Sequence, residues 1–177
     1  MKKYIILPLL IFSLFFSSYP QPARAVLIAV DSINDAVMDT NQTNYWEAGI
    51  DLLLVPGEYE ITPFAGAWTA WDATIPNFPG YKWNVFIYQE STQQKYQLGD
   101  WTVNYPTPQQ AFDAYKGQSL LLTESQVGKK VWFFIEDGYP WDNSGSVTVS
   151  VNSVPEPTTM LLLGLGLMGL AGVRRKM

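Results

Sequence analysis

Two apolar segments, one at each end of the sequence, limit the part of the chain that can form a folded domain. Residues 1–25 open with Lys2 and Lys3, continue through an apolar run from Tyr4 to Phe16, and close with Ala23-Arg24-Ala25. A basic start, a short apolar run and small residues at a cleavage position are typical of a secretory signal peptide. An uncleaved anchor is disfavoured because the run is shorter than the roughly 20 residues of a spanning helix. We therefore expect export, with cleavage after Ala25.

The C-terminal segment has a different pattern. Val154-Pro155-Glu156-Pro157 precedes an apolar stretch from Thr158 to Val173, and the basic residues Arg174, Arg175 and Lys176 follow it. The prolines end the preceding strand because proline lacks an amide donor. Bases after an apolar helix hold that end in the cytoplasm. The stretch is short for a membrane helix, so we expect a temporary anchor in preference to a permanent tail anchor.

These C-terminal residues, in this order, resemble a PEP-CTERM protein-sorting signal. The resemblance rests on Pro155-Glu156-Pro157, the glycine-containing apolar stretch and the basic pair Arg174-Arg175. It implies a Gram-negative bacterium that makes exopolysaccharide, and recognition of the tail by an exosortase-type membrane protease. It further implies a transient stay in the inner membrane, loss of the tail, and delivery to the cell surface, outer membrane or extracellular matrix. We expect three parts: a signal peptide (1–25), a folded domain (26–153) and a sorting signal (154–177).

The charge of the domain differs from that of the whole chain. The chain has 11 basic and 16 acidic residues, but six of the bases and only one acid lie in the two end segments. Residues 26–154 therefore carry five bases and 15 acids, a net charge of −10. An acidic surface of this kind excludes nucleic acid as a partner, because nucleic-acid affinity comes from basic contacts to phosphate.

The chain contains no cysteine and no histidine, which narrows its possible chemistry. The absence of cysteine excludes disulfides and thiolate metal sites. The absence of histidine excludes the common catalytic triads and the usual zinc ligand sets. Oxygen chemistry remains, with carboxylates, amides, hydroxyls and hard cations such as Ca²⁺.

The domain is predicted to be all-β, a single β-sandwich or jelly roll. Residues 145–151 alternate apolar and polar side chains, as in a half-buried strand, whereas residues 130–135 are apolar on both faces, as in a central strand. We expect further strands at 83–89 and 118–124, and a hairpin that joins 46–55 to 58–64 through Pro56-Gly57. Residues 108–115 are predicted to form a short helix, with Thr107 as its N-cap.

The segment between the two most regular strands is rich in oxygen donors. Asp137, Asp142 and Asn143 are close enough in sequence for one tight loop to bring their oxygens together around a cation. Ca²⁺ takes six to eight oxygen ligands, so carbonyls, water or a ligand's hydroxyls would supply the others. The alternative reading is structural, because Asp, Asn, Ser and Gly are also the residues that β-turns use.

Residues 137–149 also resemble the calcium loop of the bacterial galactose-binding lectins, which are small galactose-binding-like β-sandwiches. Weaker similarity extends to residues 57–61 and 66–71. The resemblance implies a Ca²⁺ ion held by the side chains of Asp137, Asp142 and Asn143 and by the backbone carbonyl of Trp71. In that family, two hydroxyls of the sugar complete the shell of the metal. The chain lacks the histidine by which those lectins contact galactose.

Aromatic side chains supply a second indication of sugar binding. Trp68, Trp71, Tyr81 and Trp83 flank a turn, and Trp101, Tyr105 and Trp141 lie in other loop-like stretches. The alternative is that these large side chains form the core of a small sandwich. Trp71 and Trp141 each neighbour a carboxylate, so we predict a ligand site formed by Trp71, Asp72, Tyr139 and Trp141.

Together these features predict an exported, non-catalytic protein of the cell surface or exopolysaccharide matrix that binds carbohydrate through Ca²⁺. A purely structural surface protein, with at most a structural Ca²⁺, is the first alternative. A polysaccharide-acting enzyme that uses two carboxylates is the second.

Overall fold

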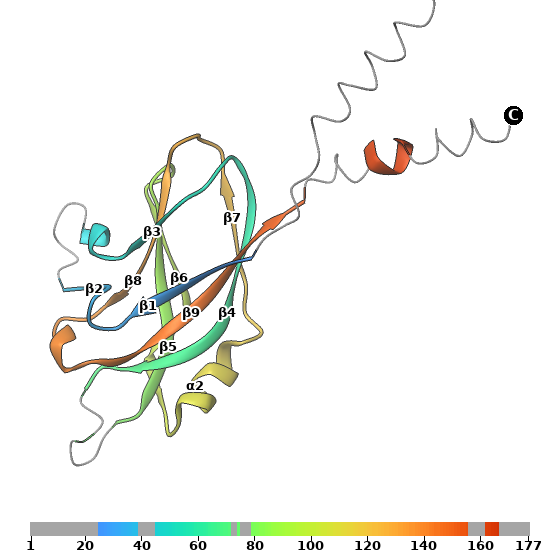
Figure 1. Ribbon diagram of the computed structural model, residues 1–177. Coiled ribbons are helices and arrows are strands. Elements are labelled where there is room, and N and C mark those ends of the chain that lie inside the picture. The colour runs from blue at the N-terminus through green and yellow to red at the C-terminus, as the bar shows by residue number, and fades with distance from the viewer. Residues whose placement is uncertain (1–24, 39–44, 72–73, 75–78, 156–161, 167–177) are drawn as a thin grey trace, which may run out of the picture. The chain divides into compact units, whose positions relative to one another are not determined.

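The computed structural model describes residues 25–38, 45–71, 74, 79–155 and 162–166 (Figure 1). The chain divides into two units, one formed by Ala25–Val154 and one by the two end segments. The predicted signal peptide and most of the predicted tail helix lie outside the described residues. In the described part of the chain, no helix is long and apolar enough to cross a membrane.

The domain is all-β, and its described strands form one continuous sheet that curls into two layers (Figure 1). The strands are β1 (Val26–Asp31), β2 (Ala36–Val37), β3 (Ile50–Leu53), β4 (Gly57–Thr69), β5 (Tyr81–Gln89), β6 (Gln94–Tyr105), β7 (Leu120–Glu124), β8 (Lys130–Glu136) and β9 (Ser144–Val154). The first layer has the order β1-β9-β4-β7, and the second has the order β6-β5-β8, with β2 and β3 also paired to β8. The layers join at one corner, where Trp68 of β4 pairs with Lys82 of β5.

The two layers enclose the main hydrophobic core. Alternate residues of each strand point inward, as the period-two geometry of a strand requires. In β9 the inward positions are Val147, Val149 and Val151, which matches the predicted alternation. The core also includes Ile28, Val30, Leu54, Tyr59, Ile61, Trp68, Trp83, Val85, Ile87, Leu98, Leu122, Val131, Phe133 and Ile135.

A smaller hydrophobic cluster covers the outer face of β5 and β8. It contains Val37, Phe86, Tyr88 and Phe134, with Trp46 and Trp132 packed against it. Trp46 belongs to the 3-10 helix η1 (Tyr45–Ala48) and stacks on Tyr88, with 3.7 Å between ring centroids. These contacts explain why β8 is apolar on both faces, as its sequence indicates.

The predicted helix is confirmed as α2 (Pro108–Tyr115). The Thr107 hydroxyl accepts a hydrogen bond from the backbone amide of Gln110, and Pro108 occupies the first turn. Ala111 and Tyr115 bury the inner side of the helix in the main core.

The predicted hairpin across Pro56-Gly57 is wrong. β3 pairs with β8 in the second layer, whereas β4 pairs with β9 along one edge and with β7 on the other. Both edges of β4 are therefore already occupied over its first residues. Residues 54–56 instead carry the chain from one layer to the other, and Leu54 is buried in the core on the way.

Candidate functional site

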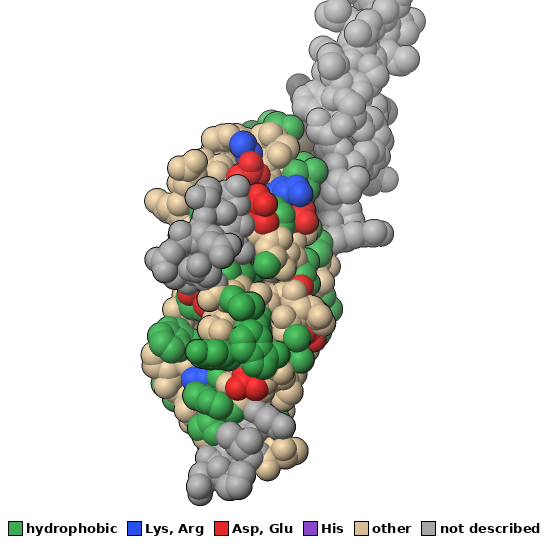
Figure 2. All heavy atoms as spheres, turned by 90° about the vertical axis from the view of Figure 1, so that its left-hand side faces the viewer, with side chains coloured by type: hydrophobic (Ala, Val, Ile, Leu, Met, Phe, Trp, Pro, Cys, Tyr) green, Lys and Arg blue, Asp and Glu red, His purple; other side chains and the backbone are tan. Residues whose placement is uncertain are grey.

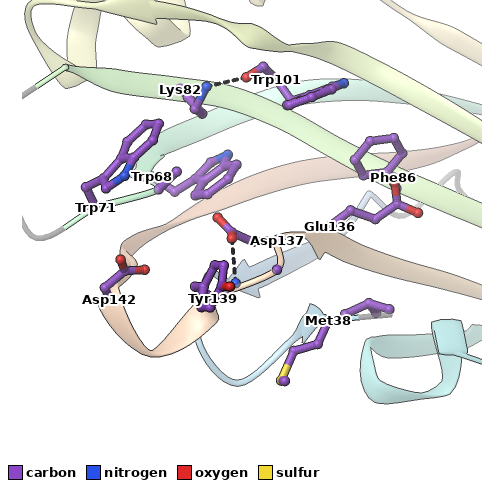
Figure 3. A pocket seen from close by; sticks show the side chains of 13 residues that line it. Met38, Trp68, Trp71, Lys82, Phe86, Trp101, Glu136, Asp137, Tyr139 and Asp142 are labelled. Atoms are coloured by element: carbon purple, nitrogen blue, oxygen red, sulfur yellow. Dashed lines mark hydrogen bonds between the residues drawn. The ribbon is translucent and has the colours of Figure 1, made fainter. Parts of the chain in front are cut away.

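An open pocket of about 350 Å³ lies where the corner between the two layers meets the turn from β8 to β9 (Figure 3). This turn contains the 3-10 helix η2 (Pro140–Asp142). Figure 2 shows the face of the domain that carries β2 and η2. Hydrophobic side chains cluster on this face, together with a few acidic and basic ones. The pocket combines aromatic and charged side chains, and it is lined by Val37, Met38, Trp68, Ala70, Trp71, Lys82, Phe86, Trp101, Glu136, Asp137, Gly138, Tyr139 and Asp142.

Three of the aromatic side chains that line the pocket are exposed to solvent. Trp71, Trp101 and Tyr139 keep 40%, 52% and 65% of their surface accessible. Trp71 follows the end of β4, and its carbonyl accepts a hydrogen bond from the Thr69 hydroxyl at 2.6 Å. Large aromatic groups that remain exposed around a hollow are typical of binding surfaces and are not needed for the core.

The placement of Trp101 depends on an irregularity between β5 and β6. Trp83 pairs with Asp100 and Tyr81 pairs with Tyr105, so residues 101–104 of β6 lie opposite Lys82 alone. Such a bulge re-aims side chains next to a site. It brings the Trp101 carbonyl to the Lys82 ammonium, which donates a hydrogen bond to it (Figure 3).

Lys82 forms part of the pocket wall, although only 4% of its surface is exposed. Its Nζ lies 5.7 Å from the ring centroid of Trp71 and 6.0 Å from that of Trp101, within the range of cation–π attraction. Burial lowers the pKa of Lys82 below its usual value, and the negative charges of Asp137 and Asp100 oppose this change. The pocket thus contains a partly desolvated cation between two indole rings.

The acidic side chains of the pocket come from β8 and the turn that follows it. Glu136 forms an ion pair with Lys95 at 2.5 Å. Asp137 accepts a hydrogen bond from the Tyr139 amide at 2.8 Å, and its carboxylate points into the pocket (Figure 3). Asp142 lies at the other end of the turn.

The four predicted metal ligands lie close to this pocket. Asp137, Asp142 and Trp71 line it, and Asn143, the residue after Asp142, is buried and is not part of the lining. The Thr69 hydroxyl contacts both the Trp71 carbonyl and the Ser144 hydroxyl, at 2.6 and 3.1 Å, which holds the Trp71 turn against the start of β9.

Two oxygens of the predicted calcium loop have no hydrogen-bond partner among the described residues. They are Oδ1 of Asp142 and Oδ1 of Asn143, and both atoms are buried. The amide nitrogen of Asn143 donates to the Ser32 carbonyl at 2.9 Å, which fixes the direction of the amide group. Buried oxygens without partners are uncommon and match the hard-donor chemistry that Ca²⁺ prefers. No cluster of three or more acidic side chains suited to a metal occurs in the described part of the chain.

Only two of the four predicted sugar-binding residues line the pocket. Trp71 and Tyr139 line the pocket, and Asp72 lies outside the described residues. Trp141 is 64% exposed and contacts the Tyr139 ring edge-on at 5.3 Å, but it is not part of the pocket wall. Trp101 takes the place that the sequence assigns to Trp141.

Lys82 is the pocket residue that the sequence reasoning missed. It is the only charged residue within the apolar run of β5, Tyr81–Gln89, and that isolation was the available signal. A charged residue in such a run is rarely fully buried unless it has a specific partner or role.

Comparison with protein-family models matches residues 153–176 to the PEP-CTERM protein-sorting motif. No curated protein and no solved structure matched the chain. The motif indicates that the protein is exported and is sorted by exosortase, a membrane protease, toward the cell surface. The resemblance of residues 137–149 to lectins received no support from these comparisons.

Proposed function

We propose that the exported domain binds carbohydrate in the pocket between η2 and the β4–β5 corner. The observation that carries this proposal is the arrangement of Trp71, Trp101 and Tyr139, three exposed aromatic rings around one open hollow. A pyranose ring presents an apolar C–H face that packs on such rings and hydroxyl groups that need hydrogen-bond partners. Asp137 and Asp142 supply acceptors beside the rings.

Single substitutions of exposed tryptophans test this proposal. Trp71→Ala and Trp101→Ala each remove a stacking surface worth about 1 kcal/mol, so each should weaken glycan binding by about fivefold to tenfold. Trp141→Ala is the matched control, because Trp141 is even more exposed than Trp71 and Trp101 but lies outside the pocket wall. Titration calorimetry of residues 25–154 against a glycan panel measures the affinities. Equal losses for all three variants would contradict a site in this pocket.

We further propose that one Ca²⁺ ion binds beside the pocket. The support is the pair of buried, unpartnered oxygens of Asp142 and Asn143. Asp137 and the Trp71 carbonyl would complete the protein ligands, and the ion would neutralise the carboxylates and coordinate sugar hydroxyls. The oxygen-only donor set fits Ca²⁺, which tolerates irregular geometry.

Thermal unfolding tests the Ca²⁺ proposal, because a ligand of the native state raises its stability. We expect a higher Tm in Ca²⁺ than in EDTA, and a further increase when a bound glycan is added. Asn143→Ala should abolish the Ca²⁺ shift. An unchanged Tm in Ca²⁺ would rule out the ion, and a Ca²⁺ shift without any glycan response would favour the structural alternative.

A further inference from the structure

Lys82 differs from every other lysine of the domain in its surroundings. Lys95, Lys116, Lys129 and Lys130 each form an ion pair with a carboxylate at 3.1 Å or less. Lys82 is the most buried of the five lysines. Among the described residues, however, no carboxylate oxygen lies within 4.0 Å of its Nζ, the distance that defines an ion pair. Burying a charge without an adjacent counter-charge costs free energy of desolvation, so an anion bound beside this ammonium would be stabilised by it.

The Lys82 ammonium also has hydrogen-bond donors that no described residue satisfies. The group has three N–H donors. In the described part of the chain it makes one hydrogen bond, to the carbonyl of Trp101. Since Lys82 lines the pocket between Trp71 and Trp101, a group bound there can accept the remaining bonds.

The charged groups divide the pocket into two sides. Lys82 comes from β5, whereas Asp137 and Asp142 come from the turn across the pocket (Figure 3). The Glu136 carboxylate is already paired with Lys95 and adds little net charge. A complementary ligand must therefore bring acceptor oxygens to Lys82, and hydroxyl groups to the two aspartates or to an ion that they hold.

A hexuronic acid residue has this distribution of groups. Its carboxylate at C5 can pair with the ammonium. Its hydroxyls at C2 and C3, across the ring, can donate to the aspartates or coordinate a Ca²⁺ ion that the aspartates hold. The ring between them provides the C–H face for the tryptophans. A neutral sugar would add no counter-charge to the one that the described residues fail to supply within ion-pair distance, and Lys82 would repel the ammonium group of an amino sugar.

We infer that the pocket selects an acidic polysaccharide built from uronic acid residues, and that Lys82 binds the sugar carboxylate. The inference rests on the proposed carbohydrate function and adds the class of the ligand. A charge-assisted hydrogen bond of this kind is about twice as strong as a neutral one, and it is specific for a group that most sugars lack.

The test compares oligogalacturonate with its methyl ester, which has the same ring but no charge. Titration calorimetry of the full chain in detergent should show the acid binding about tenfold more tightly than the ester, the difference expected for one charged hydrogen bond. Lys82→Met, which keeps the length and apolar stem, should bind both forms equally. Lys130→Met is the control, because Lys130 belongs to the same sheet but neither it nor its partner Asp51 lines the pocket, so the difference should be preserved.

The possible failures are distinguishable. If the wild-type protein binds acid and ester equally, or prefers a chitosan oligomer, the inference is overturned and the carbohydrate function stands. If Lys82→Met retains the preference for the acid, the assignment to Lys82 is overturned, and the circular dichroism spectrum shows that the variant is folded. If no glycan binds at all, the proposed function fails as well. The wild-type comparison needs no variant, so it remains decisive even if Lys82→Met does not fold.

Discussion

Glu124 is a buried carboxylate that holds the β5–β6 turn against the end of β7. It accepts hydrogen bonds from the Ser91 hydroxyl at 2.7 Å, from the Gln89 amide at 3.2 Å and from the backbone amide of Gln126 at 2.8 Å. Burial raises the pKa of Glu124, but these hydrogen bonds together outweigh burial, and the net pKa is below the usual value. The charged form is therefore the form that stabilises the fold.

This shift predicts a pH-dependent contribution to stability. Because the folded pKa is lowered, the contribution of Glu124 is present above the unfolded pKa of 4.5 and is lost as the pH falls through the folded value. Glu124→Gln should lower the free energy of unfolding by about 1–3 kcal/mol at neutral pH, and this difference should shrink in acid. Urea unfolding at both pH values measures it. Asp113→Asn, at an exposed ion pair, is the control and should have little effect, whereas a pH-independent loss at Glu124 would contradict the prediction.

At the scale of single elements, β6 shows how a local irregularity forms one wall of the pocket. Gly99 has φ +83°, and a Cβ at this position would clash with the carbonyl oxygen of Trp83. The β5–β6 register changes in the residues that follow, which is where Trp101 turns toward Lys82. Gly99 thus permits the close strand pairing on which the position of Trp101 depends.

Gly99→Ala should therefore lower the free energy of unfolding by more than the cost of a positive φ alone. The control is Gly128→Ala, because Gly128 also has a positive φ, +76°, but no atom would lie near its Cβ. Strain in the left-handed region costs about 1–2 kcal/mol, which is the loss expected at Gly128. Gly99→Ala adds a clash with the backbone and should cost clearly more in chemical unfolding. Equal losses at the two positions would show that the clash is relieved by a small shift of the strands.

The elements also show which parts of the fold can be predicted from the sequence. β9, β8 and α2 were predictable because their signals are local: alternation in β9, a continuous apolar run in β8, and Thr107 with Pro108 at the start of α2. The pairing of β3 with β8 was not predictable, because it depends on the whole sheet: β9 and β7 occupy both edges of β4 and leave none for β3. β6 was missed since its exposed, mostly polar residues hide the strand pattern.

The candidate site was predictable in part for the same reason. Asp137, Asp142 and Asn143 are close in sequence, so their grouping in one turn follows from the loop itself. Lys82 and Trp101 are brought together by the bulge between β5 and β6, which no sequence spacing reveals. Trp141 is next to Asp142 in sequence, yet it is not part of the pocket wall.

At the scale of the whole domain, β9 connects the candidate site to the sorting motif. It begins at Ser144, directly after Asp142 and Asn143, and ends at Val154, directly before Pro155. Its 11 residues span about 35 Å at roughly 3.3 Å per residue. β1 runs antiparallel to β9, so its first residue, Val26, lies opposite Val151 near the far end of β9. Both ends of the folded domain therefore lie at the end away from the pocket.

This arrangement predicts that removal of the tail leaves the fold and the site intact. The last strand pair is Glu58 with Val154, so a chain that ends after Val154 loses no paired residue. Its Tm and glycan affinity should equal those of the full chain, while the protein should appear in the medium because the sorting motif is missing.

The matched control is a chain that ends after Ser150, which lacks the buried Val151 and its pairs with Val26 and Ile61. That deletion removes a fully buried side chain and several strand hydrogen bonds, and it should lower the free energy of unfolding by at least about 2–3 kcal/mol. A large loss of stability in the longer chain would show that the tail contributes to the fold.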